Sequence, residues 1–570
     1  MLGKNFFLKL AWNNVRRNRS VYLPYVVAVA IISGVFFLVN AIIESKSISN
    51  MPSGQTAQLI LKFAVVVFGI FAFSFMLYIN GFLIKRRKRE FGLYSVLGLE
   101  KGHVCRVLLI ENLLTLGGGV GVGFLFAGVF GRLIFMLLLY FIHSSPGSVF
   151  ELPANAFIVT GALFGAVFLV TSLYNTAQIR LANPVALLQS EKKGEKDSKL
   201  LWPAAIFGAG GMALSYWAAL SIPDPSFALL LFFPIAALVI LATQALFRSG
   251  SIVFLKFLKG RKKLYYKPNN FISISGMFQR MKQNASGLAT ICILGTMLVV
   301  TVCLSTSLYL NQEASLKAEY PFGVNVYMRE VTDDAVFTAF DAEIGNLAQA
   351  HNVALSYDAG KLVAAKDATK ATLNRIVVND GSKILNLKNS LVLDGVLMFD
   401  VKGQENDCIA FTADVRGYYQ TMPLDSYYMS DIYSARQGYY GIFGGLIFAG
   451  AFFAILFLAV TVLIIYFKQI TEGYEDRERF VILQKVGMDD RQVKSTINRQ
   501  ILWVFFIPLV GALVNAAFST GLIVKILQVF RLYDSDLTVW CMVITCALFS
   551  LTYLVAYRVT AKTYYKIIKW

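Results

Sequence analysis

Residues 91–104 read FGLYSVLGLEKGHV and residues 480–493 read FVILQKVGMDDRQV, and these two related stretches decide the architecture of the chain. Each has a Phe seven positions before a Gly, a branched aliphatic residue beside that Gly, an acidic residue after it and a Val at its end. Each also follows a charged cluster, RKRE at 87–90 and DRER at 476–479. An internal repeat of this kind predicts two equivalent halves.

The repeated stretches lie between long apolar runs. Of the 570 residues, 56% are hydrophobic and only 15% are charged, and the mean hydropathy is +0.60. A transmembrane helix needs about 20 mostly apolar residues. Runs of that length centre near residues 32, 71, 119, 168, 209, 237, 299, 454, 514 and 547. The sequence therefore predicts a polytopic α-helical membrane protein with about ten transmembrane helices.

The charges between the runs predict the topology. Basic residues concentrate in segments 1–20, 85–106, 180–199, 248–282, 468–499 and 558–570, whereas segments 44–57, 143–155 and 220–226 nearly lack them. Because short cytoplasmic loops carry the excess of Lys and Arg, both termini are expected in the cytoplasm of a multi-pass plasma-membrane protein. The net charge of +19 thus lies beside the membrane, and no nucleic-acid partner is expected.

One long polar segment, residues 311–436, follows the seventh run and is expected outside the cytoplasm. It holds 11 basic and 17 acidic residues. A helical stripe runs from Val336 to Leu347 behind a possible cap at Thr332, and segments 322–327, 375–378 and 408–412 have strand patterns. An α+β extracellular domain between helices 7 and 8 is predicted.

These observations divide the chain into four parts. They are a cytoplasmic amphipathic helix (1–20), transmembrane helices 1–7 (21–310), the extracellular domain (311–436) and transmembrane helices 8–10 (437–570). In the first part, Leu8, Ala11, Trp12 and Val15 form the apolar stripe of a helix that lies in the cytoplasmic leaflet.

The two repeated stretches predict coupling helices, at about 85–103 and about 470–493. A short amphipathic helix that ends in Gly suits docking in the groove of a motor protein. The alternative is two interfacial helices that merely follow the charge statistics of membrane loops. The candidate contact residues are Arg89, Glu90, Phe91, Tyr94, Leu97 and Gly98 in the first copy, and Arg477, Glu478, Phe480, Leu483, Val486 and Gly487 in the second.

At these residues the chain resembles the FtsX-like, or MacB-type, permease superfamily. LGGG at 116–119 and NPVALL at 183–188 look like the glycine-rich helix and the proline segment of that family. The ten-helix layout is most similar to the bacitracin-resistance (BceB-type) permeases. This resemblance implies a separate ABC ATPase and a membrane histidine kinase as partners. Two copies of the ATPase are expected, because the chain has two coupling helices. It also implies a peptide or lipid substrate at the outer leaflet of a bacterial membrane.

Several kinds of chemistry have no support in the sequence. There is no G-x-x-x-x-G-K-[ST] phosphate-binding motif, no H-E-x-x-H and no pair of C-x-x-C motifs. We therefore expect no enzyme activity and no cofactor in this chain, with ATP and Mg bound by the partner ATPase. Gly117, Gly119, Gly121 and Gly123 lie in an apolar run without a preceding strand, which favours helix packing over nucleotide binding.

Glu111 is an ionisable residue within the third apolar run, and Gln500 has the equivalent position 389 residues later. Such a residue could form a polar link between the two halves. A position near the cytoplasmic interface, without that role, is the interpretation we favour.

The function expected from all of this is mechanotransmission, in which a permease couples ATP hydrolysis to handling of an amphipathic substrate, as in antimicrobial-peptide resistance or sensing. One alternative is a scaffold that regulates a histidine kinase or a cell-wall hydrolase without transport. Another is lipid or lipoprotein translocation. An ion-coupled transporter would need charged residues at mid-membrane, and the sequence offers few.

Overall fold

The computed structural model describes residues 4–49, 51–144, 150–181, 201–266, 268–320, 322–328, 334–356, 362–363, 375–377, 384–386, 395–421, 427–485, 490–530, 532 and 534–568. Within these residues, ten helices are long and apolar enough to cross a membrane, which confirms the prediction of a polytopic helical protein. The candidate spans are Val21–Ile43, Ser53–Ile84, Lys101–Phe141, Ala154–Leu181, Leu201–Ser221, Pro225–Gly260, Ala285–Leu310, Ile432–Gly473, Phe505–Val529 and Ser535–Ala561.

Many helices are longer than their spans, because they continue into the polar segments on either side. Their bounds are α1 Lys4–Arg17, α2 Arg19–Ile43, α3 Lys46–Ser49, α4 Pro52–Val96, α5 Lys101–Phe141, α6 Ala154–Leu181, α8 Leu201–Ser221, α9 Pro225–Ala245, the π-helical η1 Leu246–Gly250, α10 Ser251–Gly260, α11 Lys262–Tyr265, α12 Pro268–Leu310, α13 Gln312–Glu319, α14 Asp334–Ala350, α15 Glu405–Gln420, α16 Ile432–Lys485, α17 Asp490–Val529 and α18 Ser535–Ile568.

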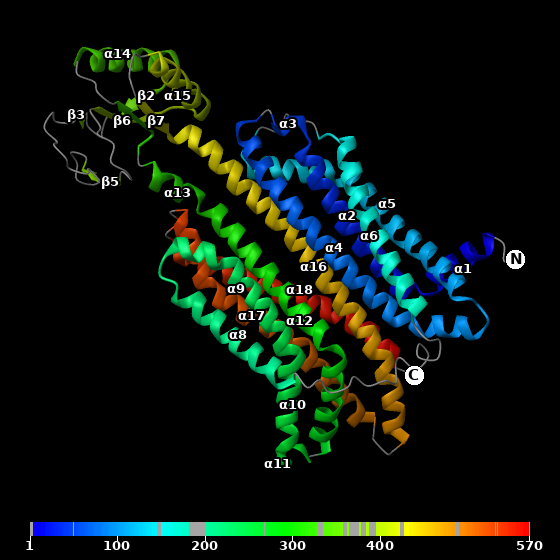
Figure 1. Ribbon diagram of the computed structural model, residues 1–570. Helices are drawn as coiled ribbons and strands as arrows, with labels where there is room; N and C mark the ends of the chain where they lie inside the picture. The colour runs from blue at the N-terminus through cyan, green and yellow to red at the C-terminus, as the bar shows by residue number, and fades with distance from the viewer. Residues whose placement is uncertain are drawn as a thin grey trace.

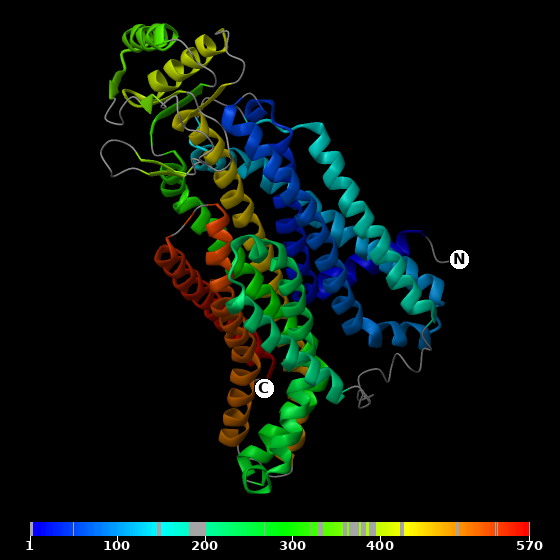
Figure 2. The same cartoon turned by 60° about the vertical axis from the view of Figure 1, so that its left-hand side comes forward.

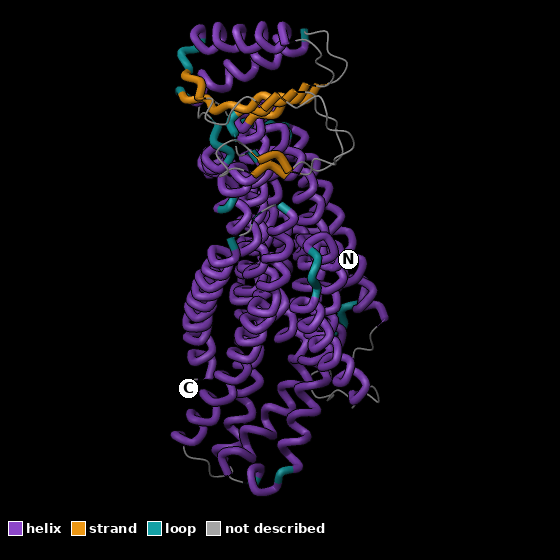
Figure 3. Tube along the Cα trace, turned by 90° about the vertical axis from the view of Figure 1, so that its left-hand side faces the viewer, coloured by secondary structure: helices purple, strands orange, loops and turns teal. Residues whose placement is uncertain are grey.

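The helices form an elongated bundle with a sheet-containing domain at one end, which we call the sheet end (Figures 1 and 3). The opposite end carries the turn between α4 and α5 together with α10 and α11, and we call it the basic end (Figure 2). One half of the bundle packs α2 against α4, α5 and α6, and the other packs α12 against α16, α17 and α18. Contacts between α4 and α16 join the halves, with α8 and α9 at the side against α17.

The domain at the sheet end is built on an antiparallel sheet. Its strands are β1 Val324–Met328, β2 Ala354–Ser356, β3 Leu362–Val363, β6 Gly395–Lys402 and β7 Tyr427–Asp431, in the order β2-β6-β1-β7, with β3 also paired to β6. In the register, Val326 lies opposite Leu397 on β6 and Met429 on β7. Strands β4 Arg375–Val377 and β5 Ile384–Asn386 pair separately. A helical membrane protein with a small antiparallel domain between its seventh and eighth spans is the predicted fold class.

Helices α14 and α15 supply the apolar side chains that pack against the sheet. Ile344 from α14 and Phe411 from α15 are fully buried beside Val324, Val326 and Phe399 of the strands. The predicted stripe at 336–347 thus lies on a helix, although Thr332 is outside the described residues.

The strand predicted at 408–412 is wrong, because these residues lie within α15. Its buried residues Cys408, Phe411, Thr412, Val415 and Tyr419 recur with the spacing of one helical face. A five-residue window was too short to separate that spacing from the alternation of a strand.

Glycines let α2 and α5 approach closely. A Cβ added at Gly123 would lie 2.2 Å from the Ser33 hydroxyl oxygen, and one at Gly119 would lie 2.6 Å from the Val29 side chain. At Gly117 and Gly121 an added Cβ would meet nothing within 4 Å. Two of the four glycines therefore lie in the helix interface and two do not.

A Gly123→Val substitution is expected to lower the thermal unfolding temperature of the purified protein, because the helix backbones must move apart to admit the new side chain. The cost expected from such overpacking is about 1–3 kcal/mol. Gly121→Val, on the open side of the same helix, is the matched control. Equal unfolding temperatures for the two variants would contradict the close-packing role of Gly123.

Candidate coupling site

The first repeated stretch forms the last turns of α4 and the turn into α5. Helix α4 runs without a break from its span to Val96, so the predicted coupling segment is an extension of a transmembrane helix rather than a separate helix. Figures 1 and 2 show these last turns lying at an angle to the rest of α4, below the end of α6, before the chain turns into α5.

The helix ends at Gly98 for a conformational reason. Gly98 has a φ of +93°, a backbone conformation that favours glycine, and the Leu99 N–H donates to the Tyr94 carbonyl oxygen at 3.0 Å. This is the hydrogen bond of a Schellman motif. Leu99 and Tyr94 also pack against the same small core, as this motif commonly requires.

The candidate residues of the first copy have different environments. Phe91 is 2% exposed in a core with Val104 and Leu108 of α5, whereas Leu97 is 78% exposed at the tip. Tyr94 and Glu90 are half-buried, and the side chain of Arg89 is not among those that the structure describes. Phe91 therefore holds the segment in place, and Leu97 is available for contact with another molecule.

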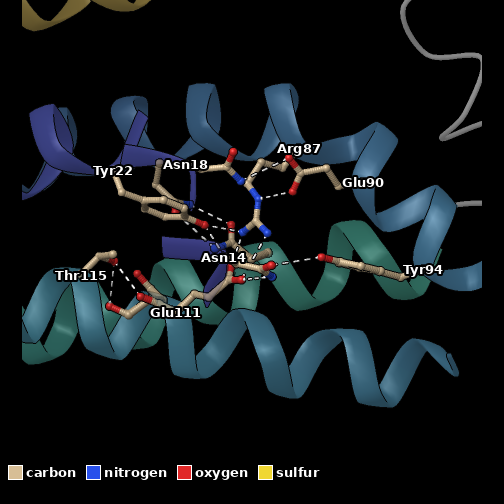
Figure 4. A network of polar contacts seen from close by, with 11 residues as sticks. Asn14, Asn18, Tyr22, Arg87, Glu90, Tyr94, Glu111 and Thr115 are labelled. Atoms are coloured by element: carbon tan, nitrogen blue, oxygen red, sulfur yellow. Dashed lines mark hydrogen bonds and ion pairs between the residues drawn. The ribbon is translucent and has the colours of Figure 1, made fainter. Parts of the chain in front are cut away.

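A buried ion pair lies directly beneath this segment (Figure 4). Arg87 of α4 and Glu111 of α5 are 3% and 2% exposed. The Arg87 guanidinium donates to both carboxylate oxygens of Glu111, at 3.2 Å for Nη2 to Oε1, and its Nε donates to Glu90 Oε2 at 2.9 Å. Such a bidentate ion pair fixes the relative position of two helices more tightly than a single hydrogen bond does.

Residues of α1 and α2 complete the cluster. The Tyr22 hydroxyl donates to Glu111 Oε2 at 3.0 Å and also contacts Arg87 Nη1. Asn14 of α1 donates to Glu111 Oε1 at 2.8 Å, and its own Oδ1 accepts from the Tyr94 hydroxyl at 3.3 Å. The side chains in Figure 4 thus join four helices at one point.

The charge of the cluster is well compensated. Burial lowers the pKa of Arg87, but Tyr22 and Glu111 raise it more, so that it lies above the ordinary value. The guanidinium also stacks on Phe91, at 5.0 Å from the ring centroid, and on Tyr22, at 5.5 Å. A displacement of the end of α4 would therefore be transmitted to α1, α2 and α5 together, since each contributes a bonded side chain.

The buried polar contacts continue into the membrane-spanning part of the same half. Asn112 of α5 donates to Thr171 and Ser172 of α6, at 3.0 and 2.8 Å. Asn80 of α4 and Asn175 of α6 bond each other reciprocally, at 2.8 and 3.2 Å. These bonds connect α4, α5 and α6 next to the ion pair.

The second repeated stretch is described in less detail. Helix α16 carries the chain to Lys485, and α17 begins at Asp490, so Val486 and Gly487 lie outside the described residues. Glu478, Phe480 and Leu483 belong to α16, but the structure does not describe their side chains. Arg477 is exposed on the same helix.

The two halves differ at the position of the ion pair. The residue 389 positions after Arg87 is Asp476, which is also buried, and the residue equivalent to Glu111 is Gln500. One turn and two turns earlier on α16, Glu472 and Lys468 form a buried pair at 3.8 Å. At the positions equivalent to Arg87 and Glu111, the second half therefore has an Asp and a Gln in place of the Arg and the Glu.

The position of Glu111 answers a question that the sequence left open. It is buried, and its described partners all belong to the first half, so within the described residues it forms no polar link between the halves; its position near the cytoplasmic interface stays a prediction. Arg87, Tyr22 and Asn14 were missed as its partners. The useful signal was an ionisable residue inside an apolar run, which needs an opposite charge within reach.

The similarity to a known protein family falls in the same two halves of the chain. The family model described as FtsX-like permease C-terminal matches residues 62–184 and 451–564. The uncharacterized ABC transporter permease YvcS of Bacillus subtilis is 22% identical, over 90% of this chain and 92% of that protein. The ABC transporter permease protein YxdM of B. subtilis is 23% identical, over 90% and 93%.

Two bacitracin export permeases are also similar. The BceB protein of Halalkalibacterium halodurans is 26% identical over 58% of this chain and 53% of that protein, and the BceB protein of B. subtilis is 20% identical over 90% and 92%. Each of the two segments that the family model matches contains one copy of the repeated stretch. Residues 62–184 and 451–564 belong to the FtsX-like permease family, and the chain has the BceB, YvcS and YxdM permeases as distant homologues.

Proposed function

We propose that this chain is the permease subunit of an ABC transporter complex, in which it carries movement from a separate ATPase to the domain at the sheet end. The observation that carries the proposal is the length of α16. This single helix runs from Ile432, at the edge of the sheet, to Lys485, in the second repeated stretch. Its 54 residues span about 80 Å, and Figure 1 shows it along the whole molecule.

The upper end of α16 is fixed to the domain. Asp431, the last residue of β7, is fully buried, and its carboxylate accepts from the Ser434 N–H at 2.6 Å, as at a helix N-cap, and from Arg416 Nη2 at 2.6 Å. The Tyr433 hydroxyl donates to the Val401 carbonyl oxygen of β6 at 2.6 Å. Axial movement of the helix would therefore move the sheet.

A second group of contacts joins α16 to α13 just below the domain. Arg436 pairs with Glu313 at 3.3 Å and with Glu405 of α15 at 3.5 Å. The Tyr440 hydroxyl donates to Glu313 at 2.6 Å, and the His143 ring stacks on Tyr440 with centroids 4.0 Å apart. The junction is polar and bonded on several sides, which suits transmission of force better than a free hinge does.

The orientation and partners follow from this proposal. The basic end faces the cytoplasm, with both termini, and residues 311–436 lie outside the cell membrane. Two ATPase subunits bind ATP and Mg and dock at the two repeated stretches, while this chain has no catalytic role. The client is an amphipathic peptide or lipid at the outer leaflet, and two relatives are named bacitracin export permeases. A membrane histidine kinase, which the family resemblance implies, is a further candidate partner.

A Leu97→Asp substitution tests the docking. Leu97 is exposed at the tip of α4, where the proposed ATPase would cover it. The variant is expected to retain at least tenfold less cognate ATPase during co-purification, since about 1.4 kcal/mol of lost contact gives a factor of ten. The measurement is the ATPase-to-permease ratio in mild detergent, together with ATP hydrolysis in lipid.

Leu181→Asp is the matched control, because Leu181 is an exposed aliphatic residue at the end of α6 in the same half. It should retain the ATPase. Equal losses for both variants would point to a general effect of charge, and wild-type protein that binds no ATPase would favour a regulatory scaffold instead.

A further inference from the structure

An open basic surface pocket, which we call the cavity, lies where α1 meets α2. It is lined by Asn13, Arg16, Arg17 and Arg19 and has a volume of about 570 Å³. We propose that the cavity binds the phosphate headgroup of an anionic phospholipid.

The charge of the cavity selects an anion. Its lining has three guanidinium groups and no carboxylate, and α1 contains no acidic residue. Among the described residues, none of the three arginines forms a salt bridge within the chain. Guanidinium groups match phosphate oxygens in geometry and hold them by two hydrogen bonds each.

The position of the cavity favours a lipid over a free anion. The span of α2 begins at Val21, two residues after Arg19, so the arginines lie at the boundary of the apolar region. On α1, Leu8 and Trp12 are more than half exposed, while Phe7 and Ala11 pack on α5. An exposed apolar stripe next to exposed arginines is typical of a helix that lies at the membrane interface.

The cavity and the ion-pair cluster share the last turns of α1, because neighbouring residues of that helix contact one or the other. Asn14 donates to Glu111 and Asn18 donates to Glu90, at 2.8 and 3.4 Å, whereas Asn13 and Arg16 line the cavity on α1. A bound headgroup would therefore fix the position of the α1–α2 junction, and through it the end of α4. This effect on α4 rests on the proposed coupling function, whereas lipid binding itself is independent of the ATPase.

The test is titration of the full chain, without ATPase, by short-chain phosphatidylglycerol in detergent, with bound lipid counted by native mass spectrometry. A triple Arg16→Gln, Arg17→Gln, Arg19→Gln variant is expected to bind about 100-fold more weakly, because each basic side chain near an anionic surface contributes roughly a factor of five. Phosphatidylcholine of the same chain length should not compete.

The matched control removes the same charge from α10 and α11 by Lys259→Gln, Arg261→Gln and Lys263→Gln, all exposed. This control should keep its affinity within about threefold. An equal loss would mean general attraction to basic loops and would overturn the site. Competition by inorganic phosphate at the same concentration, or by an acidic peptide but not by lipid, would also overturn it.

Discussion

An Arg87→Met variant is expected to unfold at a clearly lower temperature than the wild type. Methionine leaves the Glu111 carboxylate buried among Tyr22, Asn14 and the helix core without its cation. Removing one partner of a buried ion pair costs about 3–5 kcal/mol, because the remaining charge must be desolvated or neutralised. The measurement is thermal unfolding of purified protein, at one scan rate in one detergent, since such unfolding is often irreversible.

Arg106→Met is the control for this variant. Arg106 is exposed on α5, one turn before Glu111 and outside the cluster. It should change the unfolding temperature little, as surface substitutions usually do. If Arg87→Met and Arg106→Met had the same unfolding temperature, the buried ion pair would not contribute to stability.

Removing both partners separates stability from coupling. In an Arg87→Met, Glu111→Leu variant no buried charge is left alone, so most of the lost stability should return. The bonds that Arg87 and Glu111 form among α1, α2, α4 and α5 are still absent. We therefore expect the double variant to bind the ATPase yet to respond to it weakly, measured as the ratio of ATP hydrolysis to bound ATPase. A double variant as unstable as the single one would contradict this account.

The ten spans and the two halves could be predicted because the bilayer fixes the length of an apolar run and because the repeated stretch recurs in register. Leu97 and Phe91 were both identified in that stretch, but their opposite exposures depend on α5 and α6, which no local pattern reveals. Likewise, the spacing of Cys408 and Phe411 was assigned to a strand, since the sheet that buries them is formed by distant segments.

The cluster itself depends on contacts between residues far apart in sequence. Arg87 and Glu111 are separated by the Gly98 turn, and Tyr22 comes from 65 positions before Arg87. The repeat gave no help, because the second half has Asp476 and Gln500 at the equivalent positions. The sequence could show that Glu111 needed a partner, whereas only the packing of α2, α4 and α5 shows which one it has.

Interrupting α16 is expected to abolish the movement of the sheet-end domain. Ile455 is a half-exposed residue in the middle of this helix. A proline there removes one backbone hydrogen bond and clashes with the preceding turn, at a cost of about 3 kcal/mol, and bends the helix. The repeated stretch on α4 is untouched, so docking of the ATPase at that stretch should persist, while movement of the end of α16 is no longer carried to Asp431.

The movement can be measured by the distance between labels on the domain and on the bundle. Gln349 on α14 and Lys46 on α3 are exposed and suit replacement by cysteine for spin labelling. In the otherwise unchanged chain, ATP should shift this distance when the ATPase is present. In Ile455→Pro the shift should disappear, and in Ile455→Ala, which keeps the helix, it should remain.

Retention of the ATPase by Ile455→Pro shows that the variant is folded, so a lost shift then reports lost transmission. An ATP-dependent shift that survived the proline would mean that α16 is not the carrier. The other continuous route in the described structure is α12, which leads through α13 to Glu313 and its bonds with Arg436 and Tyr440. Helix α12 also packs along α16, so an intact α16 supports α12 as well. If the shift survived in Ile455→Pro, α12 would be the helix that moves the domain.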